Sequence, residues 1–269
     1  MCAFRHTSRR NIISQEIRET LTGAVDLILP FKCAVCGNVS DTKDRFGDYD
    51  RLYQELYGKE PELHICGKCL SEFTACEEIR RWLLCLSEPV ENDPVPGLPL
   101  YTPFAYTGIA EKCIPKIKFG KQIELARFFG CVMGSLLAKD GICADLMVPV
   151  PLSSSRLEER GFNQAGEIAY PVARLNGIPY AEDCLIRTRD TKRQSEIDNR
   201  FKRASNMKGA FSVSSEWDVT GLTIAVVDDV VTTGSTLHEA AAALKKAGAA
   251  DVLCIAFAGN RTVKNAEPF

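Results

Sequence analysis

Two adjacent acids at the end of an apolar run are the residues of this chain best suited to chemistry. Asp228 and Asp229 follow the apolar, largely β-branched stretch 222–227, and a hydroxyl-rich turn that contains Gly234 comes soon after them. An uninterrupted apolar run predicts a buried parallel strand. Open α/β sheets bind ligands at the carboxyl ends of such strands. Two carboxylates placed there can accept hydrogen bonds from sugar hydroxyls.

The turn after the acids has the residue types of a phosphate site. Gly234 tolerates backbone angles that are forbidden to other residues and lets a phosphate come close. Ser235 or Thr236 is expected to cap the helix that follows. Backbone N–H groups in such a turn bind phosphate together with the helix N-terminus. The simpler alternative is a buried strand that ends in an ordinary capped turn. An ATP-binding P-loop is excluded, because no Gly-Lys-Ser/Thr follows a glycine pair.

The stretch 222–236 resembles the ribose-phosphate signature of type I phosphoribosyltransferases: an apolar run, Asp-Asp, two apolar residues and Thr-Thr-Gly-Ser/Thr. The resemblance implies that Asp228 and Asp229 bond the ribose hydroxyls of phosphoribosyl pyrophosphate. It also implies that the turn cradles the 5′-phosphate. The substrate-binding residues implied in this stretch are Val230, Val231, Thr232, Thr233, Gly234, Ser235 and Thr236.

Other segments resemble the ComF family of competence-associated proteins, which is one branch of the phosphoribosyltransferase superfamily. The most specific block reads Pro-Val-Pro and then, after Arg156, Arg160-Gly-Phe-Asn-Gln. A cysteine module ahead of the main domain is also that family's layout. The resemblance covers about 21–257 and implies a type I phosphoribosyltransferase fold, an α/β fold with a mainly parallel twisted sheet flanked by helices. The matching segments are 117–120, 148–164, 185–194 and 203–211.

The loop after Pro-Val-Pro is where phosphoribosyltransferases grip pyrophosphate. Guanidinium groups suit this anion better than ammonium groups do. The residues implied there are Ser153, Ser154, Arg156 and Arg160. The alternative interpretation is that the two arginines are solvent-exposed residues at the start of a helix. Lys118 is expected near a mobile loop that covers the site, and its alternative is an exposed lysine beside an apolar run.

A catalyst of this family would displace pyrophosphate from C1 of phosphoribosyl pyrophosphate. It would work by positioning and charge stabilisation, with Mg²⁺ bridging ribose oxygens and pyrophosphate. Asp228 and Asp229 would orient the sugar, Arg156 would neutralise the departing diphosphate, and Lys118 completes the expected catalytic set. The sequence does not name the acceptor.

Two Cys-x-x-Cys pairs predict a separate metal site. Cys33 with Cys36 and Cys66 with Cys69 offer four thiolates to one structural zinc ion. The alternatives are structural free cysteines or a redox pair, which would make the chain a redox protein. The insert between the pairs, 37–65, is expected to be an exposed excursion. A metal site can accommodate it, because the entropic cost of closing a loop grows only slowly with loop length.

The segment 187–203 is rich in basic residues and supports a rival function. It is interpreted either as a hood, a segment that covers the base-binding end of the site, or as a surface that binds nucleic-acid phosphates. The simpler interpretation is a solvent-exposed face of a helix. The rival hypothesis is a non-catalytic factor of DNA uptake and competence, with single-stranded DNA and competence proteins as partners. The basic residues of the segment are Arg187, Arg189, Lys192, Arg193, Arg200, Lys202 and Arg203, interspersed with Asp190, Glu196 and Asp198.

Composition sets the limits for these hypotheses. The chain has 269 residues, is 45% hydrophobic and carries a formal net charge of −2, so it can bury a core but offers no overall charge for nucleic acid. No apolar run is long enough to span a bilayer. The basic segment 1–10 lacks the apolar core of a secretory signal. We expect a cytoplasmic protein without membrane insertion.

The pattern of elements predicts a disordered tail (1–20), a cysteine-rich zinc-binding module (21–87), a proline-rich linker (88–99) and a phosphoribosyltransferase-like domain (100–269). In the module a helix is expected at 70–86. In the domain strands and helices alternate, which favours a mainly parallel sheet. Pro171 is expected to kink or shorten its helix. The predicted strands are 100–106, 146–151, 224–228 and 252–257, and the predicted helices are 120–139, 163–176 and 235–247.

Overall fold

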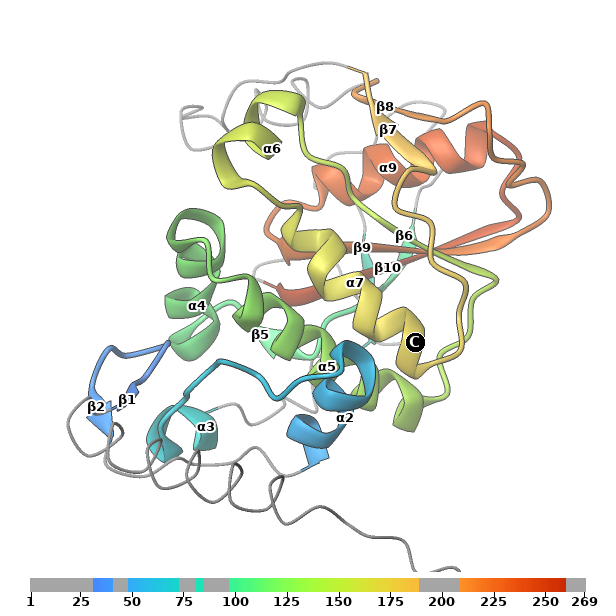
Figure 1. Ribbon diagram of the computed structural model, residues 1–269. Coiled ribbons are helices and arrows are strands. Elements are labelled where there is room, and N and C mark those ends of the chain that lie inside the picture. Colours follow the sequence, from blue (N-terminus) through green and yellow to red (C-terminus); the bar gives the residue numbers. More distant parts are fainter. Residues whose placement is uncertain (1–30, 41–47, 73–80, 85–96, 189–208, 260–269) are drawn as a thin grey trace, which may run out of the picture.

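A six-stranded sheet forms the centre of the computed structural model, which describes residues 31–40, 48–72, 81–84, 97–188 and 209–259 (Figure 1). The strand order is β3-β4-β10-β9-β6, and β5 also pairs with β10. All pairings in it are parallel except the one between β3 and β4. The mainly parallel α/β sheet is therefore confirmed. Its strands are β3 (Arg81–Leu84), β4 (Leu98–Tyr101), β5 (Phe104–Ala105), β6 (Leu146–Pro149), β9 (Thr223–Val231) and β10 (Asp251–Gly259).

The two central strands are buried on both faces, which explains their continuous apolar sequences. Ala225 and Val227 of β9 belong to one buried cluster, with side chains of α4, α5 and α7. Ile224 and Val226 belong to a second cluster, on the other face, with side chains of α9. Successive residues thus serve opposite layers, as strand geometry requires. The helices are α4 (Gly108–Gly120), α5 (Ile123–Asp140), α6 (Ser154–Arg160), α7 (Gln164–Leu175) and α9 (Ser235–Lys246).

Most of the predicted elements of the main domain are present, with shifted ends. The strand expected at 100–106 is divided into β4 and β5, which both pair with β10. The strand of the Pro-Val-Pro block, β6, is an edge strand of the path β3-β4-β10-β9-β6, where a proline is tolerated. A small antiparallel pair, β7 (Leu185–Arg187) with β8 (Phe211–Val213), lies outside the main sheet.

Helices α5 and α7 approach each other closely at a glycine. A Cβ atom on Gly130 would lie 2.2 Å from Cγ of Pro171 and 2.5 Å from the carbonyl oxygen of Ile168. The proline ring therefore fits against a backbone without a side chain. The prediction that Pro171 shortens its helix is wrong, because α7 runs from Gln164 to Leu175 through the proline.

The cysteine module contains a short hairpin, β1 (Phe31–Lys32) with β2 (Val39–Ser40), and the helix α3 (Gly67–Ser71). It shares a buried core with the main domain, since Cys33 and Cys69 cluster with Cys113 of α4. Nζ of Lys116, also on α4, donates to the carbonyl oxygen of Ala34 at 2.9 Å. The module is thus packed directly onto the helix that leads to Lys118.

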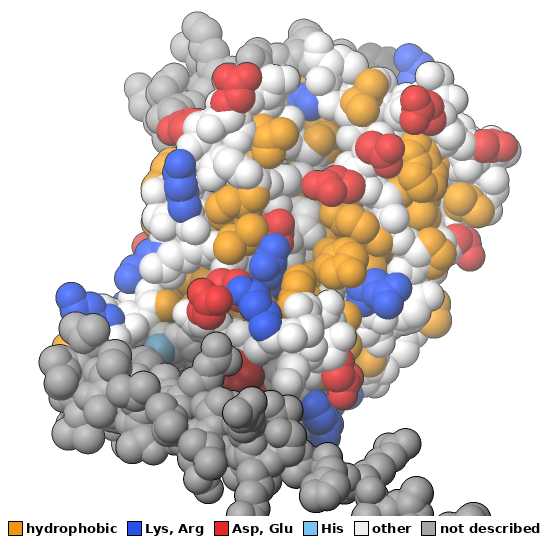
Figure 2. Space-filling view, viewed as in Figure 1, with side chains coloured by type: hydrophobic (Ala, Val, Ile, Leu, Met, Phe, Trp, Pro, Cys, Tyr) orange, Lys and Arg blue, Asp and Glu red, His pale blue; other side chains and the backbone are white. Residues whose placement is uncertain are grey.

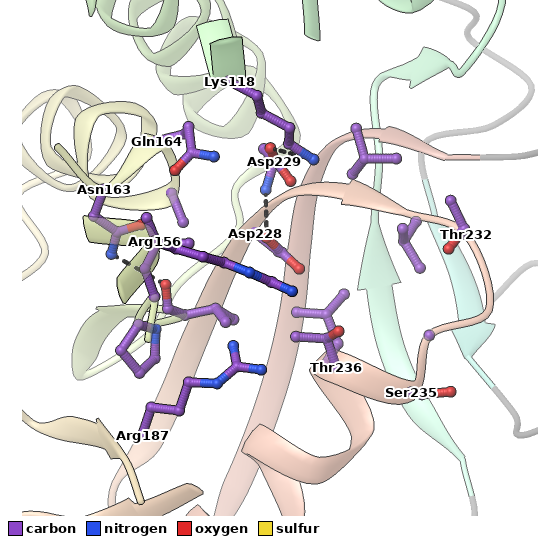
Figure 3. A pocket seen from close by; sticks show the side chains of 18 of the residues that line it. Lys118, Arg156, Asn163, Gln164, Arg187, Asp228, Asp229, Thr232, Ser235 and Thr236 are labelled. Atoms are coloured by element: carbon purple, nitrogen blue, oxygen red, sulfur yellow. Dashed lines mark hydrogen bonds and ion pairs between the residues drawn. The ribbon is translucent and has the colours of Figure 1, made fainter. Parts of the chain in front are cut away.

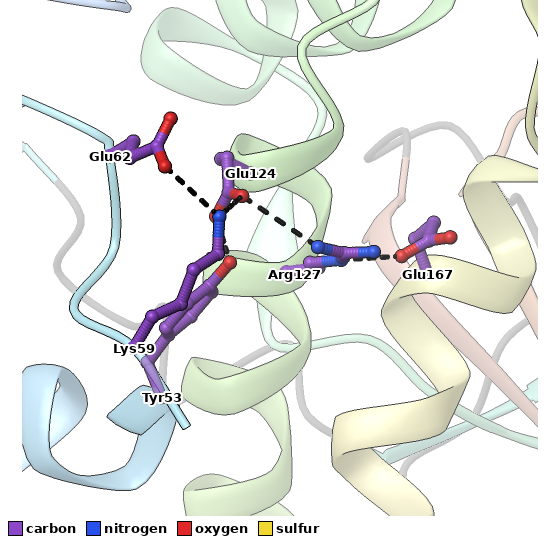
Figure 4. A network of polar contacts seen from close by, with 6 residues as sticks. All are labelled: Tyr53, Lys59, Glu62, Glu124, Arg127 and Glu167. Atoms are coloured by element: carbon purple, nitrogen blue, oxygen red, sulfur yellow. Dashed lines mark hydrogen bonds and ion pairs between the residues drawn. The ribbon is translucent and has the colours of Figure 1, made fainter. Parts of the chain in front are cut away.

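The insert between the cysteine pairs is not simply an exposed excursion. Its helix α2 (Asp48–Tyr57) packs on α5, and Tyr53 is 1% exposed. The expectation is therefore wrong for α2, because Tyr53 is buried and the Tyr49 ring packs edge-on against Phe128 of α5. A polar network joins the insert, α5 and α7 (Figure 4): the Tyr53 hydroxyl donates to a Glu124 carboxylate oxygen, and Lys59 lies 3.2 Å from Glu124. Arg127, which also contacts Glu124, lies 2.7 Å from Glu167 on α7.

The helix expected at 70–86 is wrong at its end, because 81–84 forms strand β3 and pairs with β4. Aromatic and apolar residues such as Trp82 are as compatible with a strand as with a helix. The segment forms a strand because the edge of the sheet, β4, is available for pairing. The central part of that helix (73–80), the tail (1–20), 21–30 and most of the linker lie outside the described residues, so the domain limits stay a proposal.

None of the helices in the described part of the chain has the length and apolar character needed to cross a membrane. On the face drawn in Figure 2, lysine and arginine side chains are interspersed with acidic ones. This face therefore offers no extended region of a single charge sign.

Candidate functional site

A pocket opens at the carboxyl ends of β6 and β9 (Figure 3). Five parts of the chain line it: the end of α4, the loop after β6 with α6, the start of α7, the end of β7, and the segment from the end of β9 into α9. This is the edge at which open α/β sheets bind ligands. The predicted residues that line it are Lys118, Arg156, Arg160, Asp228, Asp229, Val230, Val231, Thr232, Thr233, Gly234, Ser235 and Thr236.

Two predicted residues do not line this pocket. Ser153 is 4% exposed, occupies the N-cap position of α6, and its Oγ lies 3.2 Å from Oγ of Ser155. Ser154 is the first residue of α6 and is exposed. Both serines therefore lie at the start of α6, where the Ser153 side chain makes no cap hydrogen bond, while Arg156 lines the pocket.

The two acids belong to opposite faces of β9. Residue positions alternate along a strand, so Asp228 continues the α9 side and Asp229 the side of α4. Nζ of Lys118, on α4, lies 2.8 Å from Oδ2 of Asp229, which is 6% exposed. The backbone N–H of Asp229 donates to Oδ1 of Asp228 at 2.8 Å. Lys118 is therefore an ion-pair partner inside the pocket, and the alternative of an exposed lysine is wrong.

The electrostatics of the acid pair are unequal. Burial first, and then the negative charge of Asp229, raises the pKa of Asp228 to about 7, while the charge of Lys118 acts in the opposite direction. Two carboxylates so close cannot both ionise easily. Near neutral pH, Asp228 is thus able to exchange a proton when a ligand enters the pocket.

The turn between β9 and α9 places a glycine in the left-handed region at the N-terminus of a helix. Gly234 has φ +78°, in the left-handed region that favours glycine. It occupies the N-cap position of α9 itself, so the expectation that Ser235 or Thr236 caps the helix is wrong. Oγ1 of Thr233 lies 3.0 Å from Oγ of Ser235, which orders the hydroxyls of the turn. The N-terminus of a helix attracts anions.

Cationic side chains face the turn and the acids. Arg156 and Arg160 come from α6, and Arg187 comes from the end of β7. Figure 3 shows Arg156 and Arg187 extending into the pocket towards Asp228. Both arginines of α6 therefore line the pocket, and their expected role in binding pyrophosphate stays a prediction.

Sequence reasoning missed three polar residues of the pocket. In the sequence, Arg187 stands out only as part of the basic segment, whose remainder, 189–203, lies outside the described residues. Asn163 and Gln164 stand out there only as residues of the family motif, and both line the pocket. Gly161, with φ +84°, ends α6, and the chain then starts α7 at Gln164. The motif Gly-Phe-Asn-Gln was the available signal, because it describes this turn between two helices.

A second site lies in the cysteine module. The Sγ atoms of Cys33, Cys36, Cys66 and Cys69 all lie within 4.8 Å of one another, and the pair Cys36–Cys66 is 3.8 Å apart. Tetrahedral zinc with Zn–S bonds of about 2.3 Å requires sulfur atoms about 3.8 Å apart. The backbone N–H of Cys66 donates to Sγ of Cys33 at 3.3 Å. Burial raises the pKa of Cys33, but backbone hydrogen bonds at Cys36 and Cys66 outweigh it and lower the pKa to about 7. The four cysteines are thus able to hold a metal ion.

Comparisons with known proteins agree with this arrangement. The family model of the phosphoribosyl transferase domain matches residues 157–267. The chain is 34% identical over 168 residues to the DNA utilization protein YhgH of Salmonella typhi, a match that covers 59% of this chain and 71% of that protein. It is 28% identical over 192 residues to the competence protein ComFC of Bacillus subtilis, covering 69% of this chain and 72% of that protein.

Among solved structures, the glutamine phosphoribosylpyrophosphate amidotransferase of B. subtilis complexed with ADP and GMP is similar. The match has a TM-score of 0.34 and 26% identity, and covers 49% of this chain and 27% of that chain.

Proposed function

Because the chain belongs to the ComF family of phosphoribosyltransferase-type proteins, we propose that its pocket binds phosphoribosyl pyrophosphate with Mg²⁺. We further propose that it transfers the phosphoribosyl group to an acceptor with release of pyrophosphate. One observation carries the proposal: Asp228 and Asp229 lie in the same pocket as the Gly234 turn, Lys118 and the arginines of α6. This combination offers acceptors for sugar hydroxyls between two regions suited to phosphate.

Each part of the ligand has a complementary partner. The turn 232–236 and the N-terminus of α9 suit the 5′-phosphate. Asp228 and Asp229 accept hydrogen bonds from the ribose hydroxyls. Arg156 and Arg160 bind the pyrophosphate, whose charge they neutralise as it leaves.

The residues also fit a magnesium ion, since carboxylate oxygens are ligands that Mg²⁺ accepts together with water and phosphate oxygens. Asp228 and Asp229 would hold it. When bound, the ion supplies additional charge neutralisation at the pyrophosphate oxygens.

In the transfer step the acceptor's lone pair forms a bond to C1 of the ribose. The bond between C1 and the pyrophosphate oxygen breaks, and its electron pair leaves with pyrophosphate. Positive charge then develops on the ribose, close to Asp228 and Asp229, and negative charge on the leaving group, close to Arg156. The residues therefore act by positioning and by charge complementarity.

Calorimetric titration of the full chain with phosphoribosyl pyrophosphate, with and without Mg²⁺, tests the binding. We expect stoichiometric, Mg²⁺-dependent binding in the wild type. Asp229→Asn should weaken binding at least about tenfold, or about 1.4 kcal/mol, and keep the circular dichroism spectrum of the wild type. Wild-type affinity in this variant would remove the case for Asp229. Release of pyrophosphate, measured over a panel of acceptors, then tests transfer.

For the cysteine cluster we propose one structural zinc ion, held by Cys33, Cys36, Cys66 and Cys69. The four thiolates fill its tetrahedral shell, so the ion has no open position for chemistry. The expected result is one zinc per chain by elemental analysis, and its loss in Cys33→Ser. A zinc-free wild type, or unchanged metal content in the variant, would contradict the assignment. Tight stoichiometric zinc would also exclude a redox role for the pairs.

The names of the relatives favour a second function, because they include a DNA utilization protein and competence proteins. We propose that the chain acts in such DNA processing in the cytoplasm, with single-stranded DNA and competence proteins as partners. Binding of single-stranded DNA should weaken steeply with salt. Charge reversal at the basic residues of 187–203 should abolish it. Salt-independent binding, or binding unaffected by the reversal, would count against this function.

A further inference from the structure

Ala34, within the first cysteine pair, is bonded on two sides through its backbone. Its N–H, next to Cys33, donates to the carbonyl oxygen of His64 at 2.7 Å, just before the second pair. Its carbonyl oxygen accepts from Nζ of Lys116 on α4 at 2.9 Å. The loop of the first pair is therefore joined both to the second pair and to a helix of the main domain.

Helix α4 contacts the cysteine module with one face and the pocket with another. Cys113 is buried in the same apolar cluster as Cys33, and Lys116 lies on nearly the same side of the helix, three residues later. Lys118 lies two residues after Lys116, about 200° further around an α-helix. Its side chain leaves the opposite face, and its Nζ lies 2.8 Å from Asp229 (Figure 3). The module and the acid therefore meet the same helix from opposite sides.

The end of α4 is anchored at Lys116 through its backbone as well. Pro115 lies inside the helix and has no N–H, so α4 lacks one backbone hydrogen bond just before Lys116. The backbone N–H of Lys121, which ends the helix in the left-handed region at φ 51°, donates to the carbonyl oxygen of Lys116. Lys118 lies between these two residues. Its placement is therefore set by a turn that begins at Lys116.

A second charged contact between α4 and the module is weaker. Nζ of Lys112 lies 3.8 Å from a carboxylate oxygen of Glu72, and both side chains are exposed, at 55% and 38%. Exposed ion pairs contribute little, because water competes for both groups. Lys116, by contrast, is half-buried and donates to a backbone carbonyl of the cysteine loop. Lys116 is therefore the better placed of the two lysines to transmit a change in the module.

We propose that Lys116 is a positioning residue. By holding the carbonyl oxygen of Ala34, it makes the placement of Lys118 beside Asp229 depend on whether the four-cysteine site holds its metal ion. Lys116 itself lines neither the pocket nor the metal site. The inference rests on the proposed zinc and phosphoribosyl sites, and goes beyond both because it joins them.

The two cysteine pairs are held in fixed relative positions when four thiolates share one ion. Ala34 then has a fixed place against α4, and Lys116 holds the last turn of the helix where Lys118 reaches Asp229. When the pairs do not share an ion, the loop of Ala34 is less restrained, and Lys118 contacts Asp229 for less of the time. Such a coupling is reciprocal: a ligand that binds better with Lys118 in place also increases the affinity for zinc, by the same factor.

The titration of Asp228 reports the position of Lys118, because burial and Asp229 raise the pKa of Asp228 whereas the charge of Lys118 opposes them. The Asp228 carboxyl group is followed by carbon NMR in the zinc-loaded full chain, and the affinity for ribose 5-phosphate by calorimetry. In Lys116→Met we expect the titration midpoint of Asp228 to rise and the affinity to fall about tenfold. Lys116→Arg keeps a charged donor and should restore both.

Lys112→Met is the matched control. It removes the same charge from the same helix, together with only the exposed contact to Glu72. The midpoint of Asp228 should stay as in the wild type, and the affinity for ribose 5-phosphate within about twofold of it. Circular dichroism and elemental analysis of zinc show whether each variant keeps its fold and its metal.

The zinc affinity of the wild type is a second measurement, which needs no variant. It is determined by competition with a chelating dye, with and without saturating ribose 5-phosphate. We expect the ligand to tighten zinc binding about tenfold in the wild type and by less than about twofold in Lys116→Met. The wild-type result decides the coupling even if Lys116→Met does not fold.

Three results would overturn the proposal. They are an unchanged Asp228 midpoint and affinity in Lys116→Met, equal changes in Lys112→Met, and a wild type whose zinc content is nil or whose zinc affinity does not respond to bound ribose 5-phosphate. If the wild type binds no ribose 5-phosphate, the proposed function fails, while the Asp228 midpoint in Lys116→Met still decides whether Lys116 positions Lys118.

Discussion

Nζ of Lys118 and Oδ2 of Asp229 lie 2.8 Å apart, and this ion pair connects the end of α4 to the end of β9 inside the pocket. Asp229 is almost completely buried, so its carboxylate depends on this partner. The pair also places a positive charge close to Asp228, where it favours the ionised acid. Lys118 thus pairs with Asp229 and favours the ionised form of Asp228 before any ligand binds.

Lys118→Met should therefore change both stability and titration. Loss of the partner of a buried carboxylate is expected to lower the free energy of unfolding by about 1–3 kcal/mol. The pKa of Asp228 should rise further, because the opposing positive charge is gone. Denaturant unfolding and a pH series of ligand titrations measure the two effects. Lys139→Met, at the exposed end of α5, is the matched control, and an unchanged titration midpoint in Lys118→Met would contradict the electrostatic role.

Ligand binding should depend on pH through Asp228, whose pKa is raised from 3.8 to about 7. Between pH 3.8 and about 7, the folded chain keeps a proton on Asp228 that the unfolded chain has released. The contribution of Asp228 to the free energy of unfolding is therefore lost as the pH rises towards 7. Asp228 must be an ionised carboxylate to accept hydrogen bonds from the ribose hydroxyls. Binding of the ligand below pH 7 must therefore release the proton of Asp228. Affinity for phosphoribosyl pyrophosphate should fall up to about tenfold per pH unit below about 7.

Calorimetry at pH 6 and pH 8, in two buffers with different ionisation enthalpies, counts the released protons. Asp228→Asn should bind more weakly and retain only the pH dependence of the ligand's own phosphate groups. If the wild type and Asp228→Asn show the same slope, Asp228 is not the titrating group.

Gly234→Ala tests the phosphate turn. Its φ of +78° disfavours a side chain, so the variant should lose about 1–2 kcal/mol of unfolding free energy and most of its affinity for ribose 5-phosphate. Gly141→Ala is a matched control, because Gly141 has φ +65° with no atom within 4 Å of an added Cβ and lies at the end of α5. The control should lose comparable stability but keep its affinity. Equal losses of affinity in the two variants would argue against a specific role for the turn.

Gly130→Ala tests the close approach of α5 and α7. The added Cβ would lie 2.2 Å from Cγ of Pro171, so the helices must separate, at a cost of about 1–3 kcal/mol. Gly120→Ala adds a Cβ with its nearest neighbour at 3.7 Å and should change stability little. The midpoints of urea unfolding compare the two, and equal midpoints would show that the helices adapt without strain.

Local features of the sequence predicted much of the fold and part of the site. The apolar run before Asp228, the glycine turn and the alternation of strands and helices depend on short-range periodicity, and β9 and α9 follow it. Predictions that depended on local preference alone were weaker: Gly234 takes the N-cap position expected for a hydroxyl residue. Trp82 lies in a strand and not in a helix, because the edge of the sheet was available for pairing.

By itself, the sequence determined the chemistry of the two sites. The acids and the turn adjoin along the chain, and the spacing within each cysteine pair fixes a tight turn, so both are defined by neighbours. Only the tertiary structure decided that Lys118 pairs with Asp229, that Arg187 joins the pocket, and that α2 docks on α5. The physical reason is that such contacts join segments distant in the chain. They form where layers of the fold meet, and residue periodicity does not encode the direction in which those layers pack.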